Sequence, residues 1–166
     1  MPGSTPAADK RVPLEAGFLG VFARGNGQRS LCDTWTASLR TTVGLQGHGF
    51  PNRFMTMAPF APAAAICNVP VCIGQHCDWI ADRFGFVCSL EVKSIQPSAA
   101  TEDGRMAHHR EVSEPTLLAQ NKNSWYRRTA ADGSQRELIA YMGGIPLYRQ
   151  TCDAMRDSGY AGFEFT

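Results

Sequence analysis

The chain has 166 residues, of which 43% are hydrophobic and 19% are charged. This composition supports the buried core of one domain and excludes wholesale disorder. The formal net charge of +1 excludes the broad electrostatic attraction that nucleic-acid binding requires. Apolar runs of about 18 residues do not occur, so we expect no membrane span. The Pro-rich start lacks a secretory pattern, so we expect a disordered tail over residues 1–16 and a cytoplasmic protein.

The N-terminal half is expected to consist of short strands, turns and loops. Apolar, β-forming stretches predict strands at residues 17–23, 40–45 and 53–57. Gly25 and Gly27 predict a turn after the first strand, and residues 30–37 are expected to form a short link. The Ala- and Pro-rich stretch 58–67 should be an irregular loop that lies against another part of the fold.

The clearest helix is predicted over residues 70–86. Asn68 is a good N-cap, and a proline at position 70 costs nothing in a first turn, where its missing N–H has no intrahelical partner. The spacing of four, three and four residues places one apolar set on a single face of this helix. Its members are Ile73, Cys77, Ile80 and Phe84.

The C-terminal half mixes helices with strands. In chain order, the sequence predicts a strand over 87–95, a polar helix over 98–113, a strand over 136–142, a helix over 146–157 and a strand over 163–165. Pro115 ends the polar helix, and Gly159 suits the C-cap of the last one. Tyr148, Cys152 and Met155 fall on one side of that last helix. This order of elements indicates an α/β or α+β domain.

Six cysteines occur in a chain without an export signal, so we expect reduced thiols. Cys67, Cys72, His76 and Cys77 are clustered, which leaves a small zinc-binding protein open as an alternative. The adjacent His76 and Cys77 would point about 100° apart on a helix, so the spacing argues against a shared metal ion. Cysteines on apolar helix faces are usually inert packing residues.

Several stretches together resemble Baeyer–Villiger monooxygenases such as cyclohexanone and phenylacetone monooxygenase. The motifs occur in the family's order from about residue 19 to residue 166, and each is weak alone but strong in register with the others. They lie at residues 24–31, 44–55, 67–71, 78–82, 123–126 (Asn-Ser-Trp-Tyr), 141–144 (Tyr-Met-Gly-Gly), 148–153 and 159–163.

The resemblance implies an α/β fold. Residues 17–166 would form the C-terminal half of a split Rossmann-like FAD domain, without the N-terminal dinucleotide-binding βαβ unit. Complete enzymes of this kind use NADPH and FAD to oxidise ketones to esters or lactones. Their Gly-rich fingerprints and active-site arginine lie upstream of this segment, and Gly25-x-Gly27 lacks the third glycine. We therefore carry over no catalytic residue and expect the chain alone to be inactive and to retain neither cofactor.

The same resemblance points to residues near cofactor and substrate. Asn68 and Val69 would begin a helix whose amides point toward the flavin, although an ordinary helix cap would also select Asn68. Trp125 matches an aromatic residue on a mobile loop near nicotinamide and substrate, and its alternative is a core anchor. The loop that lines the substrate pocket in the family is matched here by Ala64, Ala65, Ile66 and Cys67. The alternative is a simple connection made of small residues.

A segment of this kind would expose the apolar face that normally packs on the absent half of the domain. An apolar patch of several hundred Å² drives association, so we expect possible self-association through this face. The alternative to an enzyme segment is therefore a non-catalytic remnant or interaction module that docks on a partner.

Overall fold

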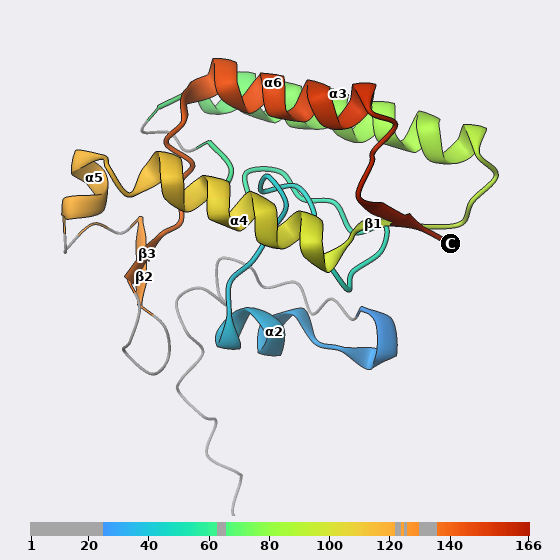
Figure 1. The fold of residues 1–166 in the computed structure, drawn as a ribbon, viewed down its shortest axis with the longest axis horizontal. Helices are drawn as coiled ribbons and strands as arrows, with labels where there is room; N and C mark the ends of the chain where they lie inside the picture. The colour runs from blue at the N-terminus through green and yellow to red at the C-terminus, as the bar shows by residue number, and fades with distance from the viewer. Residues whose placement is uncertain (1–24, 63–65, 122–123, 125, 130–135) are drawn as a thin grey trace, which may run out of the picture.

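The computed structural model describes residues 25–62, 66–121, 124, 126–129 and 136–166 (Figure 1). The expected tail over 1–16 and the strand over 17–23 lie outside these ranges. In chain order the elements are η1 (Asn26–Gln28), α2 (Leu31–Ala37), α3 (Val69–Ser89), β1 (Ile95–Pro97), α4 (Ala99–Ser113), α5 (Leu117–Gln120), β2 (Arg127–Thr129), β3 (Arg136–Leu138), α6 (Gly144–Asp157) and β4 (Phe163–Phe165). Within the described ranges, no helix is long and apolar enough to cross a bilayer.

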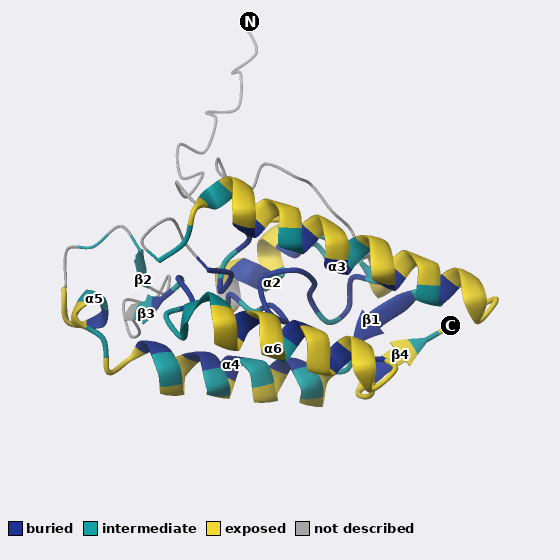
Figure 2. Ribbon diagram, turned by 90° about the horizontal axis from the view of Figure 1, so that it is seen from above, coloured by how far each residue is buried: buried dark blue, intermediate teal, exposed yellow. Residues whose placement is uncertain are grey.

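Helices α3 and α6 lie side by side on one side of the molecule, and α4 runs below them (Figure 1). The indole N–H of Trp79 in α3 donates to the Cys152 carbonyl oxygen of α6 at 3.2 Å. The almost wholly buried stretch 41–50 lies between α3 and α4 (Figure 2). One core cluster lies between α3 and α6 and includes irregular, buried backbone, and a second joins Leu31 and Trp35 of α2 to Met106 of α4.

Two antiparallel strand pairs stand at the edges of this arrangement. β1 pairs with β4 so that Ile95 faces Phe165, and β2 pairs with β3 in a hairpin. The described strands form no parallel sheet; the parallel contact among them is the isolated bridge between Pro62 and Tyr141. The expected mixture of helices and strands is confirmed, but these strand pairs do not establish the Rossmann-like sheet.

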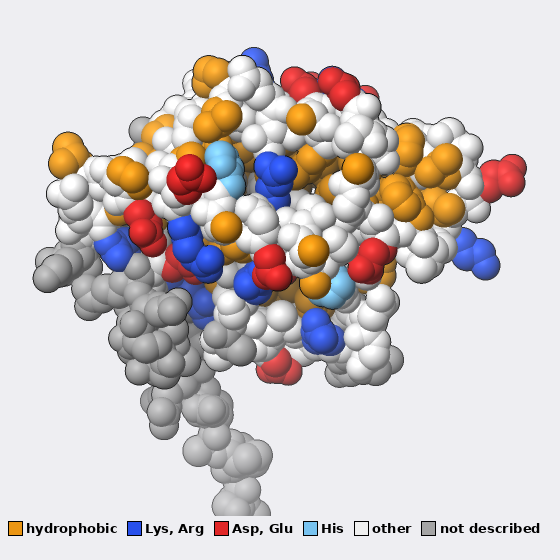
Figure 3. Space-filling model, viewed as in Figure 1, with side chains coloured by type: hydrophobic (Ala, Val, Ile, Leu, Met, Phe, Trp, Pro, Cys, Tyr) orange, Lys and Arg blue, Asp and Glu red, His pale blue; other side chains and the backbone are white. Residues whose placement is uncertain are grey.

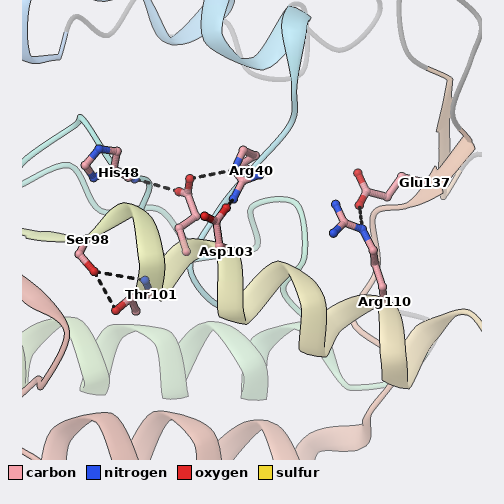
Figure 4. Close-up of polar contacts among 8 residues, drawn as sticks. Arg40, His48, Ser98, Thr101, Asp103, Arg110 and Glu137 are labelled. Atoms are coloured by element: carbon pink, nitrogen blue, oxygen red, sulfur yellow. Dashed lines mark hydrogen bonds and ion pairs between the residues drawn. The ribbon is translucent and has the colours of Figure 1, made fainter.

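Local sequence explains where α4 begins and how it is held. The Ser98 hydroxyl accepts a hydrogen bond from the Thr101 amide at 3.2 Å, as an N-cap serine does. Arg40 then binds both Glu102 and Asp103 in the first turns, and Arg110 binds Glu137 of β3 at 3.1 Å (Figure 4). These ion pairs fix α4 against the chain on both of its ends.

The end of α6 follows from Gly159. This glycine has φ +63°, the left-handed conformation that closes many helices. The Tyr160 amide donates to the Met155 carbonyl oxygen at 2.8 Å, and the Gly159 amide donates to that of Arg156 at 2.9 Å. This Schellman pattern confirms the predicted C-cap and sends Tyr160 back into the core, where it is 1% exposed.

Several sequence predictions were wrong. The expected link over 30–37 is instead helix α2 with its N-cap Ser30, whose hydroxyl accepts from the Asp33 amide. Residues 40–45 make a turn closed by a bridge between Thr42 and Gln46, since Val43 and Gly44 both have positive φ. Residues 53–57 are irregular, and the predicted strand over 87–95 is replaced by the end of α3 and by β1.

Helix α3 was placed correctly, but its predicted face is only partly buried: Ile80 packs against the core, while Ile73, Cys77 and Phe84 are exposed. The buried residues are instead one position earlier in the sequence: Cys72, His76, Trp79, Arg83 and Val87. The predicted stripe forms a neighbouring flank, on which Ile73 is 36% exposed, Phe84 is 49% exposed and Cys77 is exposed. We call Ile73, Cys77, Ile80, Phe84 and Cys88 the outer flank of α3. Hydrophobic side chains gather at the surface over the C-terminal half of α3 (Figure 3).

Candidate functional site

The candidate site is the N-terminus of α3 together with the loop that leads to it. That loop is anchored on the chain beyond β3. The Phe60 amide donates to the Ile139 carbonyl oxygen at 2.7 Å, and the Tyr141 amide donates to that of Ala61 at 3.0 Å. The path from residue 58 to residue 62 is thus fixed by backbone hydrogen bonds before the chain reaches α3.

Asn68 occupies the N-cap position of α3, with extended backbone angles, but its side chain makes no capping hydrogen bond. The side chain is exposed, and Pro70 in the first turn has no amide hydrogen. Within the described residues, no protein group accepts a hydrogen bond from the Val69 or Val71 amide. A helix of 21 residues concentrates positive partial charge at this end, so the free amides can stabilise an electron-rich carbonyl oxygen or an anion.

Four of the residues that the sequence assigned to cofactor or substrate therefore lie together. Ile66 and Cys67 are half-buried and run directly into Asn68 and Val69. The predicted residues Ala64, Ala65 and Trp125 lie outside the described residues. Their assignments remain predictions.

The expectation of reduced thiols was wrong at one place, because Cys67 and Cys72 form a disulfide. Their Cα atoms lie 6.7 Å apart, within the range that a disulfide spans, because the loop turns directly into the first turn of α3. Cys32, Cys77, Cys88 and Cys152 are free. The described ranges contain no group of three potential metal ligands, so the zinc alternative finds no support in the geometry.

Two fully buried cationic or titratable side chains lie on the inner face of α3. Nδ1 of His76 accepts a hydrogen bond from the Met57 amide at 3.3 Å, and burial lowers the pKa of His76 to about 4. Cζ of Arg83 lies 3.8 Å from the ring centroid of Phe163 and 4.8 Å from that of Trp79. Its three guanidinium nitrogens have no hydrogen-bond partner in the described part of the chain, and burial lowers its pKa to about 9.

Sequence reasoning considered His76 only as a possible metal ligand and did not single out Arg83. A signal was available in the spacing. His76 lies three residues before Trp79 and Arg83 lies four residues after it, so helical periodicity places both on the same face as this apolar residue. Neither lies at the helix N-terminus. Arg83 is held by aromatic rings, which compensate a buried cation only in part.

The described residues supply binding groups rather than reactive ones. Burial raises the pKa of the Cys152 thiol to about 12, so this cysteine remains protonated and inert at neutral pH. A cavity of about 190 Å³ lies elsewhere, between α2 and α4, beside Trp35 and Glu102. The site at α3 can orient and polarise a bound group, but it offers no evident acid, base or nucleophile.

Comparison with known proteins links this geometry to one class of enzyme. No protein-family model matches the chain. Acetone monooxygenase (methyl acetate-forming) from Gordonia sp. strain TY-5 is 36% identical over 143 residues, which cover 86% of this chain and 27% of that protein. A Baeyer–Villiger monooxygenase from Pseudooceanicola batsensis is 29% identical over 89% of this chain and 26% of that protein.

The fold agrees with the sequence comparison. The crystal structure of OTEMO in complex with FAD and NADP superposes with a TM-score of 0.80 at 29% identity, covering 91% of this chain and 27% of that one. The chain therefore spans about a quarter of the length of the relatives it matches. The predicted resemblance is confirmed by both sequence and fold.

Proposed function

We propose that this chain forms the C-terminal part of a Rossmann-like FAD domain, because it is similar to a segment that makes up about a quarter of the length of Baeyer–Villiger monooxygenases. The complete enzyme would use FAD and NADPH to oxidise a ketone to an ester or lactone. The observation that supports this most strongly is the match over nine-tenths of the chain in both sequence and fold.

The residues present fit one side of a flavin. The free amides of Val69 and Val71 and the uncommitted, exposed side chain of Asn68 form a polarised donor set, which suits a carbonyl of the flavin ring. Bound FAD, once reduced by NADPH, supplies the activation of oxygen. The contribution of this chain is to orient the ring and to line part of the substrate pocket through Ile66 and Cys67.

The described residues do not provide a cradle for the FAD pyrophosphate. Gly25 precedes η1 and would collide with the Gly49 carbonyl oxygen if it carried a side chain, whereas Gly27 lies inside η1 and faces open space. The turn leads into the three-residue η1 and not into the long helix that a dinucleotide cradle requires after its strand and glycine turn. We therefore infer that the chain is inactive alone and needs the rest of the enzyme.

The outer flank of α3 is the proposed seat for that remainder. An apolar helix face that is left exposed indicates a binding surface, and Val71 and Leu90 add exposed apolar area at the two ends of the helix. The partner is the polypeptide that corresponds to the other three quarters of the relatives. Self-association through the same flank is the expected behaviour of the isolated chain.

A chimera tests this function. This chain replaces the matching quarter of the Gordonia acetone monooxygenase, and FAD content and ketone-dependent NADPH oxidation are measured. We expect a yellow, active chimera and a colourless, inactive isolated chain. A folded chimera that binds no flavin would contradict the proposal, as would stoichiometric FAD with turnover in the isolated chain.

The role of the helix N-terminus is tested in the same chimera by Asn68→Asp. Aspartate caps helices as well as asparagine does, but its carboxylate would repel an electron-rich flavin carbonyl. We expect FAD affinity to fall roughly fivefold or more. Ser98→Asp makes the same kind of change at the N-cap of α4 and should leave FAD affinity unchanged.

A further inference from the structure

The disulfide between Cys67 and Cys72 spans the N-cap of α3. It joins the last residue of the loop to the first turn of the helix and encloses Asn68 and Val69. The Cys72 amide also donates to the Asn68 carbonyl oxygen at 3.1 Å, which is the first hydrogen bond of the helix. One covalent bond and one hydrogen bond therefore fix the backbone around the proposed flavin-binding amides.

Other cysteines of the chain indicate that this disulfide is not a permanent staple. Cys32, Cys77 and Cys88 are free and exposed. Exposed free thiols are maintained in reducing surroundings, where a disulfide is usually transient and regulatory. A bond that forms in the presence of such thiols can also be exchanged by thiols.

The two sulfur atoms are unequally placed for such exchange. Cys67 is half-buried, whereas Cys72 is 2% exposed, so an incoming thiolate reaches the sulfur of Cys67. Cys72 is then the leaving group. Its thiolate forms in the first turn of α3, where the free amides and the helix dipole stabilise negative charge.

We propose that Cys67 and Cys72 form a redox-responsive clamp on the N-terminus of α3. A small dithiol or two thiol molecules attack the disulfide, and the protein gains two electrons and two protons while the reductant is oxidised to its own disulfide. The two protein thiols then separate, and the loop next to Asn68 is released. The effect of the clamp on flavin binding rests on the proposed function, but the existence of the clamp does not.

Thiol counting tests the pair without any cofactor. The chain purified without added reductant and then denatured should show four thiols, and after reduction it should show all six. Six thiols without reduction, or four after treatment with dithiothreitol, would overturn the proposal. Peptide mapping must identify residues 67 and 72 as the cysteines that change.

Hydrogen exchange tests the clamp. On reduction, the Cys72 amide, which donates to the Asn68 carbonyl oxygen, should exchange roughly tenfold faster, while the amides in α6 remain unchanged. Cys72→Ser should show the fast exchange under both conditions, and the control Cys77→Ser should retain the redox response. Unchanged exchange on reduction of the unaltered chain would contradict a clamp.

The chimera separates this inference from the proposed function. If it binds FAD, reduction should weaken FAD retention severalfold, and Cys72→Ser should abolish that redox dependence. Equal retention in both redox states would overturn control of the flavin site. A chimera that never binds FAD counts against the proposed function alone, because thiol counting and hydrogen exchange still decide on the clamp.

Discussion

Helices α3 and α6 lie side by side, yet they distribute their apolar and charged side chains in opposite ways. α6 buries Tyr148, Cys152 and Met155, and its exposed residues include Arg156 and Asp157, which pair with each other. α3 buries His76 and Arg83 without full hydrogen bonding, and its outer flank exposes apolar residues. A helix that is apolar on more than one face needs more than one neighbour.

The difference indicates that α3 presents more exposed apolar surface than α6. On the outer flank of α3, Ile80 packs against the core, but Ile73, Cys77 and Phe84 remain exposed. This chain spans about a quarter of the length of its relatives. Under the proposed function, the other three quarters of such an enzyme supply the surface that covers the outer flank.

Trp79 and Phe84 test the contrast between the inner face and the outer flank most strongly. Trp79 is 4% exposed and donates to the Cys152 carbonyl oxygen, so Trp79→Ala should lower the free energy of unfolding by about 3–5 kcal/mol. Phe84 is 49% exposed, so Phe84→Ala should cost less than about 1 kcal/mol. Urea unfolding measures both, and similar losses would contradict an uncovered flank.

Acid should weaken the core through His76 and His109. Burial lowers the pKa of both to about 4, so the unfolded chain binds more protons between pH 6.5 and pH 4. The contribution of each neutral histidine to the free energy of unfolding is therefore fully present above pH 6.5. It falls by up to about 3 kcal/mol for each residue as the pH decreases toward 4. Urea unfolding, measured at several pH values across this window, gives the slope of the free energy of unfolding against pH.

The histidine assignment is checked by substitutions that keep the hydrogen bonds. His76→Gln can still accept from the Met57 amide, and His109→Gln can still donate to the Leu138 carbonyl oxygen. Each should flatten the pH dependence, whereas the control His108→Gln should leave the slope in place. An unchanged slope in both variants would assign acid sensitivity to other groups.

Arg83 should be replaceable without loss. Its guanidinium is buried among aromatic rings without hydrogen-bond partners in the described residues. Arg83→Met keeps most of the volume and removes the buried charge, so we expect the free energy of unfolding to rise by about 1 kcal/mol. Arg83→Ala should lower it, because a cavity remains. A clear loss in the methionine variant would show that the cation stabilises the fold.

Local signals predicted the three long helices well, but they missed the short α2 and α5 and predicted most strands poorly. Asn68, Ser98 and Gly159 mark helix ends through chemistry that operates over a few residues, and α3, α4 and α6 lie where these residues place them. The strands predicted at 40–45 and 53–57 are absent: packing, not strand pairing, buries Val43 and Leu45 and half-buries Phe54 and Met55. Positive φ angles at Val43 and Asn52 turn the chain instead.

The site could be predicted only in part. Periodicity found the apolar stripe of α3 but could not tell that the inner face would carry His76 and Arg83, because the choice of face depends on tertiary neighbours distant in sequence. The disulfide was missed because spacing alone does not show that Cys67 and Cys72 meet at a helix end. The resemblance to a known family assigned Ile66, Cys67, Asn68 and Val69 to cofactor or substrate, and this assignment stays a prediction.

The most direct test of the central claim is the alkylation rate of Cys77, which is exposed on the outer flank. It is measured in the isolated chain under conditions that keep it monomeric and in the flavin-binding chimera, each relative to Cys32 on α2. If the remainder of a monooxygenase covers this flank, Cys77 should react roughly tenfold or more slowly in the chimera. Equal relative rates in the two proteins would contradict the account.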